Sequence, residues 1–216
     1  MKKFCTLLLI FFSYHAFAQQ DSLKAYNANR VSITSHGMEV LGAWGIVNLG
    51  TGAFWGWGPS GTQAVISVNG SPVLSTPKSI GPEGKYFFQM NTIWGSVNFV
   101  TAVLGYTSTQ KYKNKKLTAA ETLEAQKKIQ KIFFVNGCLD VAYVGTGLYL
   151  KLAGDSRNSP KMKGYGESIL MQGGFLLIFD GLMYHAEKGN GSKLRNFLEK
   201  HPISFDGRRV GMVFNM

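Results

Sequence analysis

The stretch IWGSVNFVTAVLGY, residues 93–106, is apolar enough for a helix in a membrane or in a buried core, yet Asn98 stands at its middle. The stretch AWGIVNLGTGAFWG, residues 43–56, has Asn48 in the same frame. A carboxamide inside an apolar helix needs hydrogen-bond partners, because burying an unpaired polar group is costly. The two stretches therefore predict helices whose polar side chains meet in a shared interior.

Composition favours a membrane protein that begins with a signal peptide. Of the 216 residues, 16% are charged, compared with about 25% in a typical soluble domain. Residues 1–18, MKKFCTLLLIFFSYHAFA, have a positive start, an apolar centre and a small-residue cleavage site. We expect cleavage before Gln19, which leaves Cys138 without a disulfide partner in the chain. The alternative is that residues 4–18 persist as an extra anchor.

Four apolar segments approach the length of about 20 residues that crosses a bilayer. Aromatic residues mark their ends, as at the headgroup level of a membrane. The alternative, an exported soluble four-helix bundle, predicts a charged outer face on each helix, and the segments lack one. We therefore predict an all-α fold, an antiparallel four-helix transmembrane bundle in a domain of residues 19–186, followed by a basic C-terminal tail, 187–216. The expected spans are 37–57, 86–107, 132–152 and 167–186.

The connections contain turn and capping signals. Asn69-Gly70 in the first loop and Asp206-Gly207 in the tail each predict a small β-hairpin, and for the tail disorder is the alternative. Thr118 and Glu121 form a capping-box pattern, Thr-x-x-Glu. The third helix is thus expected to begin near Ala119 and to project beyond the membrane before entering it.

The first two spans match at a constant offset, which indicates an internal repeat. Each polar residue near the centre of a span also shares a helix face with residues three, four and seven positions away. If these faces meet, the central polar residues form one layer in the bundle core, and glycines let the helix backbones approach. The layer comprises Asn48, Asn98, Asp140 and Asp180; the packing glycines are Gly45, Gly52, Gly56, Gly95, Gly137 and Gly173; and the secondary polar positions are Glu39, Gln89, Asn91, Asn136 and Gln172.

Three functions fit a buried layer of this kind. In the leading hypothesis the protein has a structural or accessory role, and the layer fixes helix register through interhelical hydrogen bonds. In the second it is a small transporter or a proton- or cation-responsive protein. Asp140 and Asp180 cannot both ionise cheaply in one dry layer, so they would share a proton or one of them would be neutral. In the third it is a membrane enzyme that uses Asp140 or Asp180 as an acid or base.

No motif predicts catalytic residues, a metal or a cofactor. The histidines of the mature chain are not in ligand-spaced pairs, and there is no phosphate-binding loop or nucleophile elbow. The basic stretch QKYKNKK, residues 110–116, lacks the aromatic stacking platform of single-strand binders, so nucleic acid is not an expected partner. The expected partners are the lipid bilayer, anionic lipid headgroups and, through the glycine-rich faces, a second copy of the chain. The alternative for the basic stretch is a solvated loop.

Two orientation signals conflict. A cleaved signal places the mature N-terminus outside, so residues 107–131, with seven lysines, also face out. The inward connections, 58–85 and 153–165, contain five basic residues, and the positive-inside tendency therefore favours the reverse. We give the signal priority and expect a bacterial inner-membrane protein with periplasmic termini.

Three strings resemble an uncharacterised domain-of-unknown-function family of small bacterial membrane proteins with four helices. They are FFQMNTIWGSVN, NGCLDVAYVGTGLYL and GYGESILMQGGFLLIFDG. The resemblance covers about residues 35–186 and implies four membrane spans. It brings no established catalytic or binding residues.

Overall fold

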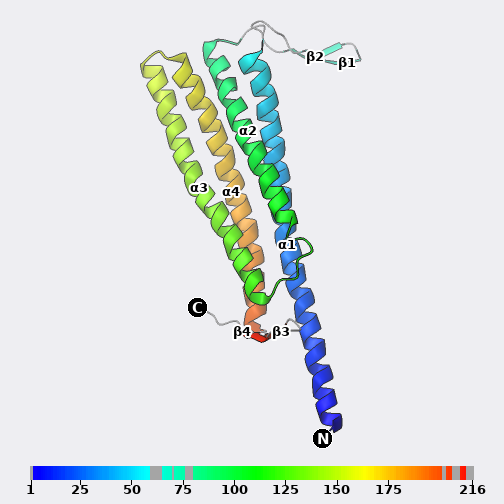
Figure 1. The fold of residues 1–216 in the computed structure, drawn as a ribbon. Coiled ribbons are helices and arrows are strands. Elements are labelled where there is room, and N and C mark those ends of the chain that lie inside the picture. The colour runs from blue at the N-terminus through cyan, green and yellow to red at the C-terminus, as the bar shows by residue number, and fades with distance from the viewer. Residues whose placement is uncertain are drawn as a thin grey trace. The chain divides into compact units, whose positions relative to one another are not determined.

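The computed structural model describes residues 2–58, 65–69, 71–75, 80–200, 203–205 and 210–212. Its four long helices are α1 (Lys2–Trp57), α2 (Pro82–Gln110), α3 (Ala119–Ser156) and α4 (Pro160–Lys200) (Figure 1). Two antiparallel hairpins pair β1 (Val65–Val68) with β2 (Ser71–Ser75) and β3 (Ile203–Phe205) with β4 (Val210–Met212). The expected helical fold with four helices is confirmed. A hairpin lies in each of the two segments where a turn signal placed one.

Local sequence sets the helix ends. Proline begins both α2 and α4, in the first turn, where a backbone N–H would have no helical partner. At the start of α3 the Thr118 N–H donates to Glu121 Oε2 (2.9 Å) and the Glu121 N–H donates to Thr118 Oγ1 (3.2 Å). This is the reciprocal capping box that the sequence predicts. Asn158, with φ of 48°, turns the chain between α3 and α4.

The helices extend beyond the expected spans. α1 is continuous from Lys2, so cleavage after residue 18, which stays a prediction, would remove its first turns. α4 continues past residue 186 to Lys200, so the segment expected as a tail begins as helix. After Pro160 no proline interrupts α4, and backbone hydrogen bonding therefore continues along it.

Among the described helices, α3 and α4 are long and apolar enough to cross a membrane, judged by length and composition. The expectation of four such helices is thus met only in part by this measure. Polar side chains inside α1 and α2, including Asn48, Asn91 and Asn98, lower the apolar content of both helices.

The chain divides into two compact units, each built from parts of all four helices. Unit 1 comprises Met1–Gly37, Gly105–Val135 and Asp180–Met216, and unit 2 comprises Met38–Leu104 and Asn136–Phe179. A hydrophobic cluster in unit 1 contains Leu23 of α1, Ala119 of α3, and Leu194 and Leu198 of α4, all at most 3% exposed.

In unit 2, α1 and α2 pack with their backbones in contact. A Cβ atom added to Gly45 would lie 2.7 Å from the Phe99 nitrogen, and one added to Gly95 would lie 2.8 Å from the Gly45 oxygen. Real Cβ atoms do not approach backbone so closely, so only glycine fits this crossing. The next contacts run in opposite directions along the two helices, Gly52 with Thr92 and Gly56 with Gln89, which makes the pair antiparallel.

A second close crossing joins α3 and α4 in unit 2. A Cβ atom on Gly147 would lie 2.5 Å from the Leu170 nitrogen, and one on Gly166 would lie 2.8 Å from the Gly147 oxygen. The packing glycines expected from the sequence did not include Gly166, although they included Gly173 on the same helix, α4. A Cβ atom added to Gly137, another glycine singled out for packing, would meet no other atom within 4 Å, so Gly137 takes part in no close crossing among the described helices.

Two alanine substitutions on α3 should change stability in opposite directions. Gly147→Ala forces a methyl group against the α4 backbone and should lower the thermal unfolding temperature. Gly145→Ala enters open space, and alanine should stabilise the helix by up to about 1 kcal/mol through its better helix propensity. Thermal unfolding of both variants in one detergent tests this. Similar shifts for the two variants would contradict the close crossing.

Candidate functional site

Gln172 of α4 lies at the centre of the polar interior of unit 2 and is fully buried. Its Nε2 donates to Asn48 Oδ1 (2.8 Å) and to Asn91 Oδ1 (3.2 Å). Its Oε1 accepts hydrogen bonds from Trp44 Nε1 (2.8 Å) and Asn98 Nδ2 (3.3 Å). One carboxamide thereby connects α4 to both α1 and α2. We call these five residues, with Ser168, the Gln172 network.

Two further hydrogen bonds extend the Gln172 network. Ser168 Oγ donates to Asn91 Oδ1 (2.5 Å), and Asn48 Nδ2 donates to the Trp44 backbone oxygen (2.8 Å). The Trp44 ring stacks on Phe175, with ring centroids 4.1 Å apart. Ser168, Gln172 and Phe175 follow one another at intervals of four and three residues, so one face of α4 carries all three contacts.

The four residues of the expected layer are all buried. Asn48, Asn98 and Asp140 are each 3% exposed and belong to unit 2, whereas Asp180, 4% exposed, falls in unit 1. The structure brings Asn48 and Asn98 together through Gln172, which the sequence analysis had placed among the secondary positions. A long side chain lets Gln172 reach partners on two helices although it starts nearer the end of its span.

The other secondary positions differ in burial. Asn91 is 2% exposed and belongs to the Gln172 network. Gln89 is half-buried and donates to the Gly56 backbone oxygen (3.0 Å). Asn136 is half-buried, and Glu39 is exposed. Glu39 and Gln89, which are 50 residues apart and correspond in the expected repeat, therefore occupy different surroundings.

Unit 1 contains a second polar interior, around Glu187 of α4. Glu187 is fully buried; its Oε1 accepts a hydrogen bond from Thr34 Oγ1 and its Oε2 accepts one from Gln126 Nε2, both 2.8 Å. The Glu187 backbone oxygen also accepts from Gln126 Nε2 (2.9 Å) and Gln130 Nε2 (3.0 Å). Glu187 of α4 is thus hydrogen-bonded to side chains of both α1 and α3.

A buried cation lies in the same unit. Arg30 is 5% exposed, donates to Asn27 Oδ1 (2.6 Å), and has its guanidinium carbon 5.1 Å from the centre of the Tyr112 ring. Glu187 lies beyond the expected span 167–186, and burial raises the pKa of its carboxyl, an effect that its hydrogen bonds and Arg30 oppose. Burial likewise lowers the pKa of Arg30, and Glu187 opposes this. Each charge therefore reduces the cost of burying the other.

The sequence analysis missed this second interior. Asn190 Nδ2 donates to Gln126 Oε1 (2.8 Å), and Asn190 Oδ1 accepts from Asn29 Nδ2 (2.9 Å). A signal was present, because buried residues of α4 continue at helical spacing past the expected span: Asp180, Met183, Glu187, Asn190, Leu194 and Leu198. The expected span ends with the apolar segment at residue 186, so the prediction did not include the rest of this pattern.

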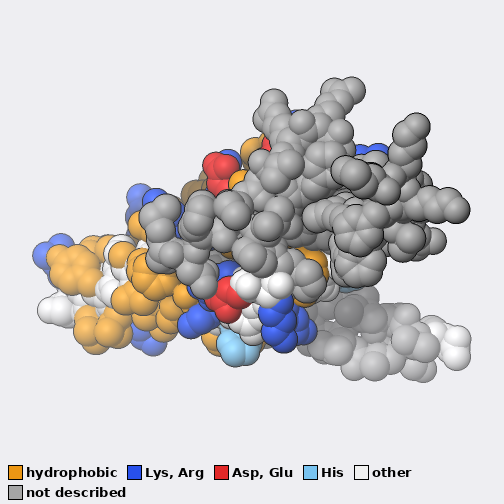
Figure 2. Space-filling model, turned by 90° about the horizontal axis from the view of Figure 1, so that it is seen from below, with side chains coloured by type: hydrophobic (Ala, Val, Ile, Leu, Met, Phe, Trp, Pro, Cys, Tyr) orange, Lys and Arg blue, Asp and Glu red, His pale blue; other side chains and the backbone are white. Residues whose placement is uncertain are grey.

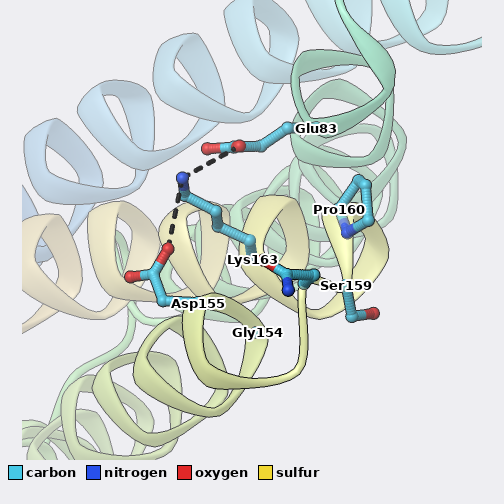
Figure 3. Close-up of a pocket in the computed structure, with 7 residues that line it drawn as sticks. Glu83, Gly154, Asp155, Ser159, Pro160 and Lys163 are labelled. Carbon is cyan, nitrogen blue, oxygen red and sulfur yellow. Dashed lines mark ion pairs between the residues drawn. The ribbon is translucent and has the colours of Figure 1, made fainter.

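A small polar pocket lies beside the turn between α3 and α4. Lys163 Nζ lies 3.2 Å from Glu83 Oε2 and 3.2 Å from Asp155 Oδ1 (Figure 3). The hydrogen bonds to Glu83 and Asp155 raise the pKa of Lys163. The pocket contains neither Asp140 nor Asp180; its lining residues are Glu83, Gly154, Asp155, Asn158, Ser159, Pro160 and Lys163. Its charged groups therefore form an ion bridge and are not the acid–base pair considered for an enzyme.

Within the described part of the chain, no group of three or more His, Cys, Asp and Glu side chains could hold a metal ion. The polar side-chain groups of the Gln172 network are four carboxamides, one hydroxyl and one indole, which exchange hydrogen bonds but do not titrate. The Gln172 network can therefore fix helix positions without carrying out acid–base chemistry.

Replacing Gln172 should destabilise unit 2 more than replacing the half-buried Gln89. Gln172→Leu removes a partner from three buried asparagines and from the half-buried Trp44, and we expect a loss of about 2 kcal/mol or more. Gln89→Leu, the matched control, removes one bond at a less buried position and should cost about 1 kcal/mol or less. Thermal or denaturant unfolding in detergent measures both. Equal losses would contradict the central position of Gln172.

Comparison with known proteins gives one match. The model of DUF6992, a family of unknown function, matches residues 60–181, which confirms the resemblance to an uncharacterised family. No curated protein and no solved structure matches the chain. Because the match takes in more than half of the 216 residues, the chain belongs to the DUF6992 family of proteins of unknown function.

Proposed function

We propose that this protein is an integral membrane protein with a structural or accessory role, in which unit 2 occupies the bilayer. The observation that carries the proposal is the reversed polarity of unit 2. Its interior holds the Gln172 network, whereas large apolar side chains cover its outside. Ile178 is 67% exposed and Leu104 is 64% exposed, while Gln172 is fully buried. Such an exterior is unfavourable in water and suits lipid.

Apolar exposure extends over all four helices of unit 2. Figure 2 shows hydrophobic side chains gathered on part of the surface seen from below. Unit 1 differs, because its exposed positions include many charged residues, among them Lys24, Lys127 and Arg195. The exposed apolar residues of unit 2 include Val40, Ile46, Val47, Phe54, Ile93, Val97, Val100, Val103, Leu139, Val141, Leu148, Leu152 and Leu177.

The distribution of charge in unit 2 supports the same proposal. Residues 40–57 of α1 and 86–104 of α2 contain no charged side chain, and residues 136–150 of α3 contain only Asp140. At 1.5 Å per residue, 18 helical residues span about 27 Å, close to the thickness of the hydrocarbon core of a bilayer. The proposal therefore takes all four helices as spans, including α1 and α2.

We place the protein in a bacterial inner membrane with periplasmic termini, on the basis of its signal-peptide pattern. The close crossings occupy five of the six glycines singled out from the sequence, Gly137 being the exception. Self-association through those five positions is accordingly not part of the proposal.

Thiol labelling tests the membrane placement. Cys138 is exposed on unit 2, so under the proposal it faces acyl chains, which a charged, water-soluble reagent does not enter. The test uses protein with Cys5→Ser reconstituted in vesicles, in which Cys138 is the remaining thiol. The control carries Lys127→Cys and Cys138→Ser in addition, so its thiol lies in unit 1. A charged maleimide should react with Cys138 at least about tenfold more slowly than with the thiol of the control. Both thiols should react alike in denaturing detergent. Equal rates in vesicles would exclude burial of unit 2 in lipid. Labelling in spheroplasts reports the side on which Lys127 lies.

A proton- or cation-responsive function is the second candidate. The observation that favours it is Asp140, which is 3% exposed in a stretch of α3 without other charge. An acid inside a membrane is a functional hypothesis by default, because placing a charge there is costly.

Carboxamide variants separate the two candidates. Asp140→Asn and Asp180→Asn keep side-chain shape but remove titration, and under the structural role both should unfold within about 1 kcal/mol of the parent. Tryptophan fluorescence followed over pH and cation concentration should then match the parent and the exposed control Asp155→Asn. Loss of a pH- or cation-dependent change in only the buried variants would favour the second candidate.

A further inference from the structure

The connection between α2 and α3 presents four lysines on an anchored loop. Lys111, Lys113, Lys115 and Lys116 are all exposed, and no acidic residue occurs between residues 105 and 120. Within the part of the chain that the structure describes, none of the four lies in an ion pair. We call residues Lys111–Lys116 the basic loop. Its four positive charges lie within six residues.

The basic loop is tied to α1 and folded by its own backbone. Asn27 Nδ2 donates to the Tyr112 backbone oxygen (2.9 Å), and Gln110 Nε2 donates to Ser35 Oγ (2.9 Å). Backbone bonds from Tyr112 N to Thr109 O (3.0 Å) and from Lys115 N to Tyr112 O (3.2 Å) form successive turns. Leu117 and Ala119, which follow, are buried. A solvated loop without anchors would lose conformational entropy on binding, whereas this loop is ordered by folding.

The surroundings of Tyr112 help to decide whether the basic loop binds nucleic acid or an anionic surface. Its ring is half-buried, with the Arg30 guanidinium 5.1 Å and the Lys115 ammonium 5.6 Å from its centroid. Single-strand binders use exposed aromatic faces on which bases stack. The Tyr112 ring is instead engaged by cations of its own chain, so the loop offers charge without a stacking platform. This favours an anionic surface over nucleic acid.

The position of the basic loop in the chain, just after a membrane span, indicates which anionic surface it meets. Under the proposed function, on which this inference rests, α2 leaves the bilayer near residue 107, and Lys111 follows four residues later, about 6 Å along a helix. Clusters of four or more basic residues next to a membrane span attract anionic headgroups. We infer that the basic loop binds the anionic phospholipid headgroups of the bilayer that contains unit 2. The lysines attract the headgroup phosphates, and Asn27 and Arg30 hold the loop in shape.

Acetylation of individual lysines tests the inference in nanodiscs of phosphatidylcholine alone or with about one third phosphatidylglycerol. A water-soluble acetylating reagent and mass spectrometry give a rate for each lysine. Phosphatidylglycerol should slow all four loop lysines by roughly threefold or more, and about 0.5 M NaCl should abolish the effect by screening. Lys24 and Lys200, exposed in the same unit, should react equally in both discs. Equal rates for the loop lysines in both discs would overturn the inference.

Two variants that remove the same charge test whether binding of anionic lipid depends on the basic loop. Lys111→Gln, Lys113→Gln, Lys115→Gln and Lys116→Gln together should abolish the enrichment of phosphatidylglycerol among lipids that copurify with the protein. The control combines Lys24→Gln, Lys193→Gln, Arg195→Gln and Lys200→Gln, removes the same charge from other exposed positions, and should retain the enrichment. Equal loss in both variants would mean that only total charge matters, against a site in the loop.

Further results distinguish a failure of this inference from a failure of the proposed function. Loop-dependent binding of a single-stranded oligonucleotide in phosphatidylcholine discs, without protection by phosphatidylglycerol, would reassign the partner to nucleic acid. A protein that resists alkaline extraction from membranes yet shows no protection would overturn this inference and leave the proposed function standing. Extraction of the protein by alkali would instead overturn the proposed function.

Discussion

The carboxamide of Gln172 uses both its donor hydrogens and its acceptor oxygen on side chains of two other helices, and the arrangement of unit 2 depends on it. Asn48 and Asn91 accept from it, and Trp44 and Asn98 donate to it. Polar groups inside a bundle with an apolar exterior cannot form hydrogen bonds with water, so each needs a hydrogen-bond partner within the bundle. The network therefore fixes the rotation of three helices, since turning any one of them would leave buried amides unpaired.

The glycine crossings make those hydrogen bonds geometrically possible. Gly45 and Gly95 lie three residues before Asn48 and Asn98, and their contact brings α1 and α2 together beside the two asparagines. The crossing of Gly147 with Gly166 brings α3 against α4 in a similar way, although the Gln172 network has no residue on α3. Small residues and interhelical hydrogen bonds are the two means by which helices associate where burial of apolar surface gives no driving force. Unit 2 uses both.

The two units have opposite relations between surface and interior. Unit 2 is apolar outside and polar inside, which suits a lipid surrounding. Unit 1 has charged side chains outside, an apolar cluster around Leu194, and a buried carboxyl, Glu187, opposed by a buried cation, Arg30. Helix composition alone predicted the apolar helices of unit 2 but not the polar interior of unit 1. The buried polar residues of unit 1 lie in segments that are too polar to be recognised as spans. Their burial depends on helices that are distant in sequence.

The sequence by itself determined the four helices, the capping box at Thr118 and the two segments that contain the hairpins, because these depend on residues within a few positions of one another. It also singled out Asn48, Asn98, Asp140 and Asp180, since an apolar helix makes a central polar residue conspicuous. Only the tertiary structure decided that Gln172 connects the asparagines, that Gly147 is packed while Gly137 is open, and that Glu187 is buried. The physical reason is that a side chain's partners depend on which helix faces meet, and many facing arrangements share the same local periodicity.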